Sequence, residues 1–392
     1  DKHVTGVQTC ALPILTQASD PVVIAAFART PMGSFQGALS PLKATELGAA
    51  AVRAAVARAG VSPEAVEQIF MGCVLPAGLG QAPARQAALG AGLPRSVQAT
   101  TVNKMCGSGM QAAIMAHDAL MAGSAEIIVA GGMESMSNAP YLLAKHRAGA
   151  RIGHDTAFDH MYLDGLEDAY EPGRLMGSFA EETARAYQFT REAMDDFAIL
   201  SLSRARTATE TGAFEGEIVP VEVATRRGAE TVATDEQPQK ADPAKIPNLK
   251  PAFAKDGTIT AANASSISDG AAALVLTRAS VAEKLGLPVV ARIVAHAAHA
   301  HEPGAFTTAP VPAMRNALAK AGLTVVQLDL FEVNAAFAVA AMIAEREMSL
   351  PREELNLIGR PSTRGHPLRA PSPRFLSILQ TARPPPGPRP LP

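Results

Sequence analysis

A cysteine in front of a predicted helix is the residue of this chain best suited to covalent chemistry. Cys106 lies in the glycine-rich segment NKMCGSGM of residues 103–110. The N–H groups at a helix N-terminus are unpaired and carry partial positive charge, which favours the nucleophilic thiolate over the thiol. Gly107 and Gly109 would let a thioester approach closely, and the N–H of Cys106 would help to hold a developing oxyanion. The alternative is a buried cysteine acting as a small apolar residue, which composition alone favours.

Asn334 and His366 are candidates for completing a site around Cys106. Asn334 lies in FEVNAAFA, residues 331–338, where a predicted strand ends and a helix begins. An Asn there is most often an N-cap, and the functional alternative is an amide that positions a water. His366 lies between Gly365 and Pro367, which predicts a loop. A lone loop histidine is usually inert in solvent, but here it would supply the base that activates a thiol.

The segments that must position Cys106 alternate between strand and helix patterns, which favours a covered, mainly parallel sheet. The region from about 138 to 256 is polar and irregular, apart from an acidic helix near 179–209, and it is typical of an inserted binding loop domain. AKAGL at 319–323 echoes ARAGV at 57–61, which is weak support for two similar halves. The predicted strands are 22–27, 68–74 and 127–130, the predicted helices are 44–59 and 83–91, and the helical stripe after Cys106 is Met110, Ala113, Ile114, His117, Leu120 and Met121.

The two ends of the chain differ in composition from the segments between them. Residues 1–15 are typical of translated adapter DNA, so we interpret them as a non-native leader. Residues 369–392 are proline-rich, and ten prolines follow Asn356, so we expect no regular core element there. We interpret this segment as an aberrant tail.

Bulk composition excludes several classes of function. The net charge of −2 and the 18% of charged residues do not suggest a nucleic-acid or polybasic membrane surface. Three cysteines without paired spacing argue against a disulfide framework and a zinc ribbon, so we predict a reducing, cytoplasmic location and no metal site. Apolar runs are too short for a membrane span.

From Pro21 to about Asn356 the chain resembles the thiolase family, in particular its acetyl-CoA acetyltransferases. The resemblance rests on the segments above and on VLPAGLGQAPARQ at 74–86, AGGMESMS at 130–137 and TAANASSISDGAAA at 260–273. It implies an α/β fold of two similar βαβαβαββ halves in α-β-α-β-α layers with an inserted loop domain. The domains would be 16–280, including the loop domain, and an incomplete 288–368.

The same resemblance implies roles for seven residues. Cys106 would be acylated, Asn334 would hold a water in an oxyanion hole, and His366 would complete that hole and activate Cys106. Four further positions would line the pantetheine and acyl pocket, although on sequence alone the first would be a turn residue and the others core residues: Ser265, Met176, Phe253 and Phe337.

The chain departs from the family pattern at several points. Ala335 stands where the family has Glu, and Lys240 follows Gln239 in the stretch where the family has an adenine-contacting Arg. No cysteine follows Cys106, so the family's second catalytic cysteine, in a late Cys-x-Gly motif, has no counterpart in this chain. We therefore expect impaired turnover.

The resemblance implies an acyltransferase of fatty acid metabolism that converts two acetyl-CoA to acetoacetyl-CoA and CoA, or cleaves 3-ketoacyl-CoA. Coenzyme A would be substrate and product, with no permanently bound cofactor, in a homodimer or homotetramer. A ketoacyl synthase is disfavoured, because its Cys-His-His pattern would need His at Asn334. A non-catalytic acyl-CoA-binding or assembly subunit remains the alternative from another class.

Overall fold

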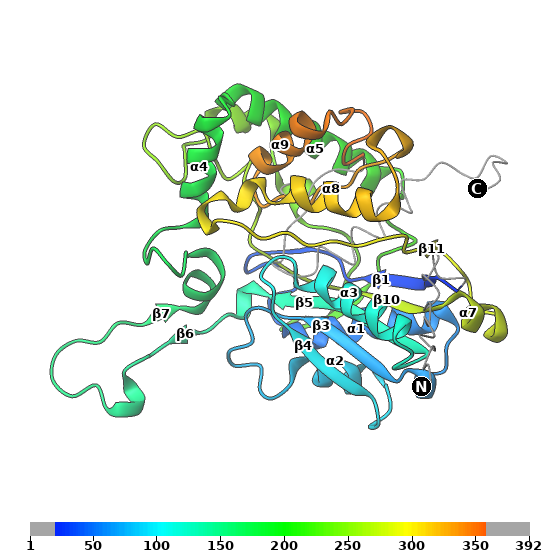
Figure 1. The fold of residues 1–392 in the computed structure, drawn as a ribbon. Coiled ribbons are helices and arrows are strands. Elements are labelled where there is room, and N and C mark those ends of the chain that lie inside the picture. Colours follow the sequence, from blue (N-terminus) through cyan, green and yellow to red (C-terminus); the bar gives the residue numbers. More distant parts are fainter. Residues whose placement is uncertain (1–19, 358–392) are drawn as a thin grey trace, which may run out of the picture.

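A computed structural model describes residues 20–357, and the leader 1–15 and tail 369–392 lie outside them. Its centre is a seven-stranded sheet in the order β11-β1-β10-β5-β3-β4, with β2 paired to β10 (Figure 1). The strands are β1 Val22–Arg29, β2 Gly33–Ser34, β3 Gln68–Gly72, β4 Gln98–Val102, β5 Ile127–Ser135, β10 Ser268–Arg278 and β11 Ala291–Arg292. The mixed α/β class is as predicted.

The sheet is mixed rather than mainly parallel, so that prediction was wrong. β3 runs parallel to β4 and β5, but β10 is antiparallel to β5, to β1 and to β2. The reason is the long insertion, because the chain leaves the sheet after β5 and returns through β10 between β1 and β5. A strand that follows so long an excursion can enter in either direction, and hydrophobic pattern alone does not distinguish the two.

Period-two alternation along the strands divides the apolar residues between two helix layers. Ile69 and Met71 pack in one core with α1 and α2, whereas Phe70 packs in another with α3. The three helices are α1 Ala44–Ala59, α2 Pro83–Ala91 and α3 Ser108–Met121. Figure 1 shows the three helices packed against the sheet. Because Cys106 comes just before α3, it lies on the side of the sheet that α3 covers.

The predicted bounds of α1 and α2 are confirmed, because their end signals are local. Glu46 reaches back to the Lys43 N–H at the start of α1, and Gly60 ends it with φ of 69°. Pro83 opens α2, and Gly92 ends it with φ of 92°. Only a residue without Cβ adopts these left-handed values without strain.

The insertion is more ordered than predicted. The single helix expected near 179–209 is two helices, α4 Met176–Ala186 and α5 Arg191–Glu210. Gln188 has φ of 56°, and Thr190 caps α5 by accepting from the Ala193 N–H, so the chain breaks between them. The remaining elements are short: β6 Tyr141–Leu142, β7 Phe158–Asp159, a π-helical turn Tyr162–Leu166, β8 Val221–Thr225, β9 Gly228–Val232 and α6 Gln237–Lys240.

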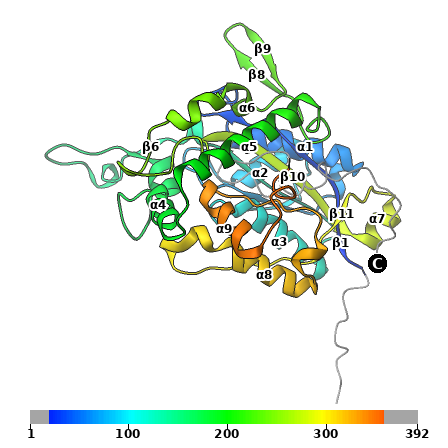
Figure 2. The same ribbon diagram turned by 90° about the horizontal axis from the view of Figure 1, so that it is seen from above.

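Two arms of the insertion extend from the body of the molecule. The β6–β7 arm projects at the left of Figure 1, and the β8–β9 hairpin projects at the top of Figure 2. The β6–β7 arm exposes large apolar side chains, since Tyr141, Leu143 and Phe158 are all exposed.

The second half of the chain builds its core together with the insertion. It contributes α7 Ala279–Leu285, α8 Pro310–Ala321 and α9 Ala338–Met348, and a parallel bridge joins Phe331 to Leu355. Buried residues of α9 share one apolar cluster with residues of α4 and α5. Helix α8 ends at Gly322 with φ of 66°, close to the 69° of Gly60 after α1, but α2 and α7 also end at left-handed glycines, so the likeness of the two halves stays a prediction.

A buried ion cluster ties the insertion to β1. The Arg29 guanidinium is fully buried and contacts Glu217 at 2.6 Å and Asp235 at 2.7 Å. Burial by itself would lower the pKa of Arg29, but the two carboxylates outweigh it and raise that pKa above its ordinary value. The Met32 N–H also donates to Asp235 at 2.9 Å, so the strand end and the loop are held together.

Replacing Arg29 with Ala should strongly destabilise the fold, because it leaves two carboxylates buried without their cation. We expect a loss of about 3–5 kcal/mol in the free energy of unfolding, measured by urea denaturation. Arg315→Ala is the matched control, because its ion pair with Glu347 is exposed and should contribute less than about 1 kcal/mol. Equal stabilities of the two variants would contradict this account.

Candidate active site

Cys106 lies just outside the carboxyl ends of the parallel strands. Gly72, Val102 and Gly132 pair at the ends of β3, β4 and in β5, and Cys106 follows β4 by four residues. Ligands of open α/β sheets bind at this edge. The predicted position at a helix start is confirmed, since Cys106 directly precedes Gly107, the N-cap of α3.

A tight hydrogen-bonded turn presents Cys106. Met105 has φ of 48°, a left-handed value that is uncommon for a non-glycine residue. The Ser108 hydroxyl donates to the Met105 carbonyl at 2.6 Å and accepts from the Lys104 N–H at 2.7 Å, while Asn103 accepts from the Met105 N–H at 3.1 Å. These contacts hold a backbone geometry that would otherwise relax, which is typical of functional sites.

The turn also sits very close to the sheet. A Cβ at Gly72 would lie 2.8 Å from both the carbonyl carbon and the Cβ of Ser108. Only glycine at position 72 lets the start of α3 approach β3 this closely. Gly72 is therefore the glycine that this site requires, in addition to those of residues 107–109 that the sequence pointed to.

Cys106 opens onto an apolar cavity of about 670 Å³ at the meeting of the sheet domain, the insertion and the second half. Cys106 is partly exposed, whereas Cys73 is buried, as predicted. All four predicted pocket residues line the same cavity as Cys106, although they come from segments far apart in the sequence: Met176, Phe253, Ser265 and Phe337.

Ser265 joins its own segment to the segment before α9 through two hydrogen bonds. Its N–H and its hydroxyl both donate to the Ala336 carbonyl at 2.7 Å, and a bridge joins Ala264 to Phe337. The ring of Phe337 meets the ring of Phe253 edge to face, with centroids 5.9 Å apart. Residues from the insertion and from the second half are in this way fixed into one wall of the cavity.

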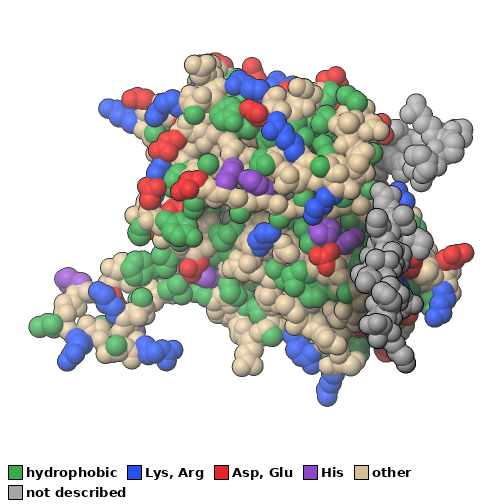
Figure 3. All heavy atoms as spheres, viewed as in Figure 1, with side chains coloured by type: hydrophobic (Ala, Val, Ile, Leu, Met, Phe, Trp, Pro, Cys, Tyr) green, Lys and Arg blue, Asp and Glu red, His purple; other side chains and the backbone are tan. Residues whose placement is uncertain are grey.

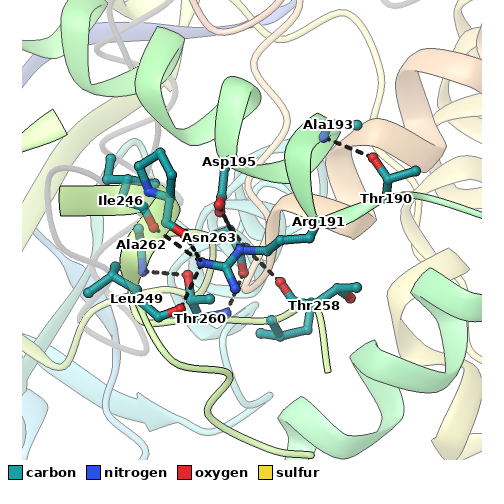
Figure 4. A network of polar contacts seen from close by, with 12 residues as sticks. Thr190, Arg191, Ala193, Asp195, Ile246, Leu249, Thr258, Thr260, Ala262 and Asn263 are labelled. Carbon is teal, nitrogen blue, oxygen red and sulfur yellow. Dashed lines mark hydrogen bonds and ion pairs between the residues drawn. The ribbon is translucent and has the colours of Figure 1, made fainter. Parts of the chain in front are cut away.

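A polar network behind this wall holds the segment that carries Ser265 (Figure 4). Asn263 donates to Asp195 at 3.3 Å and accepts from the Thr260 N–H at 2.8 Å, and its carbonyl accepts from the Ala338 N–H at 2.8 Å. Arg191 joins Asp195 at 2.6 Å and donates to the Leu249 carbonyl at 2.8 Å. The start of α5 therefore positions both the Ser265 segment and the start of α9.

Buried carboxylates hold the loops beneath the cavity. Glu134 accepts from the N–H groups of Val74 and Leu75 at 3.2 and 3.3 Å. Asp269 accepts from the Ser137 N–H at 3.0 Å, and burial raises the pKa of Asp269 because these hydrogen bonds only partly offset desolvation. Both residues belong to family-like segments for which sequence reasoning assigned no role.

Asn334 is not an N-cap, so that interpretation was wrong. Helix α9 begins at Ala338, and Phe337 is its N-cap. The Oδ1 atom of Asn334 is buried and has no hydrogen-bond partner among residues 20–357. Such an acceptor is usually satisfied by water or a ligand, which fits the alternative that the amide holds a water. Asn334 itself is absent from the described lining of the cavity, although Ala336 and Phe337 belong to it.

His366 lies outside the described residues, so the structure does not place the predicted base. Conversely, sequence reasoning missed several residues of the cavity. Gly177 is needed because a Cβ there would overlap the Phe253 ring. Lys104 donates to Gln111 at 2.8 Å on the α3 side, and His299 lines the second-half side. Met110 and Ile114 of the predicted helical stripe also line the cavity rather than a closed core.

Comparisons with known proteins agree with the predicted family. The family model described as "Thiolase, N-terminal domain" matches residues 22–280, and the one described as "Thiolase, C-terminal domain" matches residues 287–382. Acetyl-CoA acetyltransferase 2 of Arabidopsis thaliana is 50% identical over 361 residues, which is 91% of this chain and 89% of that protein.

Two fungal proteins are similar over the same extent. An acetyl-CoA acetyltransferase of Schizosaccharomyces pombe is 46% identical over 360 residues, 91% of either chain. A cytosolic acetyl-CoA acetyltransferase of Gibberella zeae is 44% identical over 361 residues, covering 92% of this chain and 91% of its own.

Ser108→Ala should slow the reaction of Cys106 with iodoacetamide by about 10-fold, because the turn loses both hydrogen bonds of the hydroxyl, a loss of about 1–3 kcal/mol. The rate is measured by mass spectrometry of the Cys106 peptide. Ser124→Ala, at an exposed position three residues beyond the end of α3, is the matched control and should react like the parent. An unchanged or faster rate in Ser108→Ala would show that the turn does not set the reactivity of Cys106.

Proposed function

This chain belongs to the thiolase family, and we propose that it is an acetyl-CoA C-acetyltransferase that moves acetyl or acyl groups between CoA thioesters through Cys106. The observation that carries the proposal is the position of Cys106. It lies at a helix N-terminus, on a constrained turn, and lines an apolar cavity large enough for a thioester arm. An electropositive, partly exposed setting of this kind is what a reactive cysteine needs.

In the degradative direction, His366 takes the proton of the Cys106 thiol. The thiolate attacks the 3-keto carbon of a 3-ketoacyl-CoA, the bond between C2 and C3 breaks, and acetyl-CoA leaves as its enolate. A proton then returns to the enolate carbon. CoA thiol attacks the acyl-cysteine and releases the acyl group as a new acyl-CoA, which restores Cys106. In the reverse direction two acetyl-CoA give acetoacetyl-CoA and CoA.

The cavity wall supports the proposed binding roles. Met176, Phe253 and Phe337 supply apolar area for the acyl group and the pantetheine arm, and Ser265 ties two of the wall segments together. Asn334 does not line the described cavity, and its proposed role is to hold a water in the oxyanion hole, where its buried Oδ1 would accept a hydrogen bond from that water.

Proton transfer at the substrate α-carbon is the step that we expect to be impaired in this chain. The family's second cysteine carries that proton, and no cysteine follows Cys106 in the sequence. The acyl transfer to Cys106 does not need that group, whereas carbon–carbon bond formation and cleavage do. The chain therefore accepts an acetyl group more readily than it completes the cycle.

We propose the same substrates, cellular location and oligomeric state for this enzyme as the family resemblance implies. Coenzyme A thioesters are its substrates and products, and the chain works in the cytoplasm as a homodimer or homotetramer. The cytosolic relative in Gibberella zeae supports this location. Within residues 20–357 there is no helix of the length and hydropathy that crossing a membrane requires.

Incubation with acetyl-CoA should add one acetyl group to Cys106, because the step needs only a reactive thiol beside the thioester. Intact-mass and peptide mass spectrometry measure the adduct. Cys73→Ser, a change at the buried cysteine, should be acetylated as the parent is, whereas Cys106→Ser should not. Binding of CoA without any adduct would instead select a non-catalytic acyl-CoA-binding subunit.

Steady thiolysis of acetoacetyl-CoA should be slower than the acetylation of Cys106 by acetyl-CoA. Removing one positioned proton carrier costs roughly 10²–10⁴-fold, and with acetoacetyl-CoA the slowed cleavage of the C2–C3 bond precedes release of the first acetyl-CoA, so thiolysis should be slow from the start, without a burst. Rapid-quench kinetics measure both rates, that of acetyl transfer from acetyl-CoA to Cys106 and that of thiolysis, and Cys106→Ser should abolish both. Thiolysis at the full rate of a thiolase with the late Cys-x-Gly motif would refute the impairment while leaving the function intact.

A further inference from the structure

Two histidines and an aspartate meet on the surface near the C-terminal end of α3, away from the groups used in the proposed reaction. Nδ1 of His117 lies 3.0 Å from Oδ1 of Asp118, and Nε2 of His296 lies 2.9 Å from the same oxygen. The two imidazole rings meet edge to face with centroids 4.8 Å apart. Three atoms able to bind a metal thus lie within 4.8 Å of one another.

We propose that His117, Asp118 and His296 form a binding site for a divalent transition metal ion of the zinc class. In a tetrahedral zinc site with bonds of about 2.1 Å, ligand atoms are about 3.4 Å apart. The two contacts to Asp118 would widen by about 0.4–0.5 Å, and the two imidazole nitrogens, which lie within 4.8 Å of each other, would come closer together to share the ion. Imidazole nitrogen with one carboxylate is a donor set for zinc, cobalt, nickel or copper, whereas magnesium and calcium prefer oxygen alone.

The three side chains are held in place from two directions. His117 and Asp118 lie on the rigid helix α3, and the segment of His296 is fixed separately, because Lys320 of α8 donates to the His296 carbonyl at 3.1 Å. Preorganised ligands lose little conformational entropy when the ion binds.

The site is ready to bind a cation from solvent. Asp118 is 60% exposed and the imidazoles are partly exposed, so water can complete the coordination. Figure 3 shows histidine side chains gathered on this face of the molecule, one group with an acidic side chain beside it.

An ion at this site would clip the second half of the chain to α3. Ala297, Ala298 and His299 follow His296 directly and line the cavity, while the other end of α3 begins beside Cys106. The ion would therefore order one wall of the cavity without touching the reacting atoms.

The test is zinc titration by calorimetry, with untagged protein in a Cys106→Ser background so that this thiol does not compete. We expect one site in this parent. His117→Gln and His296→Gln, which keep a hydrogen-bond donor toward Asp118, should lower the affinity at least about 10-fold, because losing a ligand costs no less than losing a second-shell partner. His301→Gln is the matched control, since His301 is an exposed histidine of the same segment that contacts the Ala305 carbonyl at 2.8 Å.

A second measurement distinguishes loss of the site from loss of the fold. Hydrogen exchange of the peptide that spans 293–299 should slow on zinc addition in the parent and in His301→Gln, but not in His296→Gln, while the three metal-free proteins exchange alike. No zinc binding by the parent overturns the proposal. Equal zinc affinity in the parent and the two cluster variants overturns it as well, because the ion would then bind elsewhere.

Discussion

The close approach of helix α3 to the end of strand β3 is the constraint on which the proposed chemistry depends. A Cβ at position 72 would have no room, because Ser108 and Gly109 at the start of α3 occupy that space. Because interiors are close-packed, a shift of α3 away from the sheet would move both the turn and the helix terminus that favours a thiolate. The covalent chemistry proposed for the sulfur thus depends on the packing of the three parallel strands β3, β4 and β5.

The cavity depends on a second kind of contact, the hydrogen bonds of backbone and side-chain groups that join distant segments. Ser265 and Phe337 face each other because the Ala336 carbonyl accepts twice from Ser265 and because Asn263 connects the segment to α5. Buried polar groups that satisfy one another in this way define a single arrangement of the wall.

The insertion is part of the structural core as well as a source of binding residues. Its helices α4 and α5 share an apolar cluster with α9, and the Arg29 cluster anchors it to the sheet. The wall of the proposed active site is thus stabilised by burial on one side and by ion pairs on the other. This arrangement explains how a region of polar, irregular sequence can hold Met176 and Phe253 in defined positions.

The sequence by itself determined the features whose causes act within a few residues. The ends of α1 and α2 follow from a capping carboxylate, a proline and left-handed glycines, and the place of Cys106 before α3 follows from a glycine-rich turn and a helical stripe. The family resemblance rests on motifs of the same short range. Only the tertiary structure decided which distant segments meet.

β10 lies between β1 and β5 because Ala273 pairs with Gly131 and with Ala28, residues more than a hundred positions away. The break between α4 and α5, the true start of α9 after Asn334, and the meeting of His296 with His117 were likewise invisible in the pattern. Periodicity reports which face of an element is apolar, but the partner of that face is selected by the packing of the whole chain.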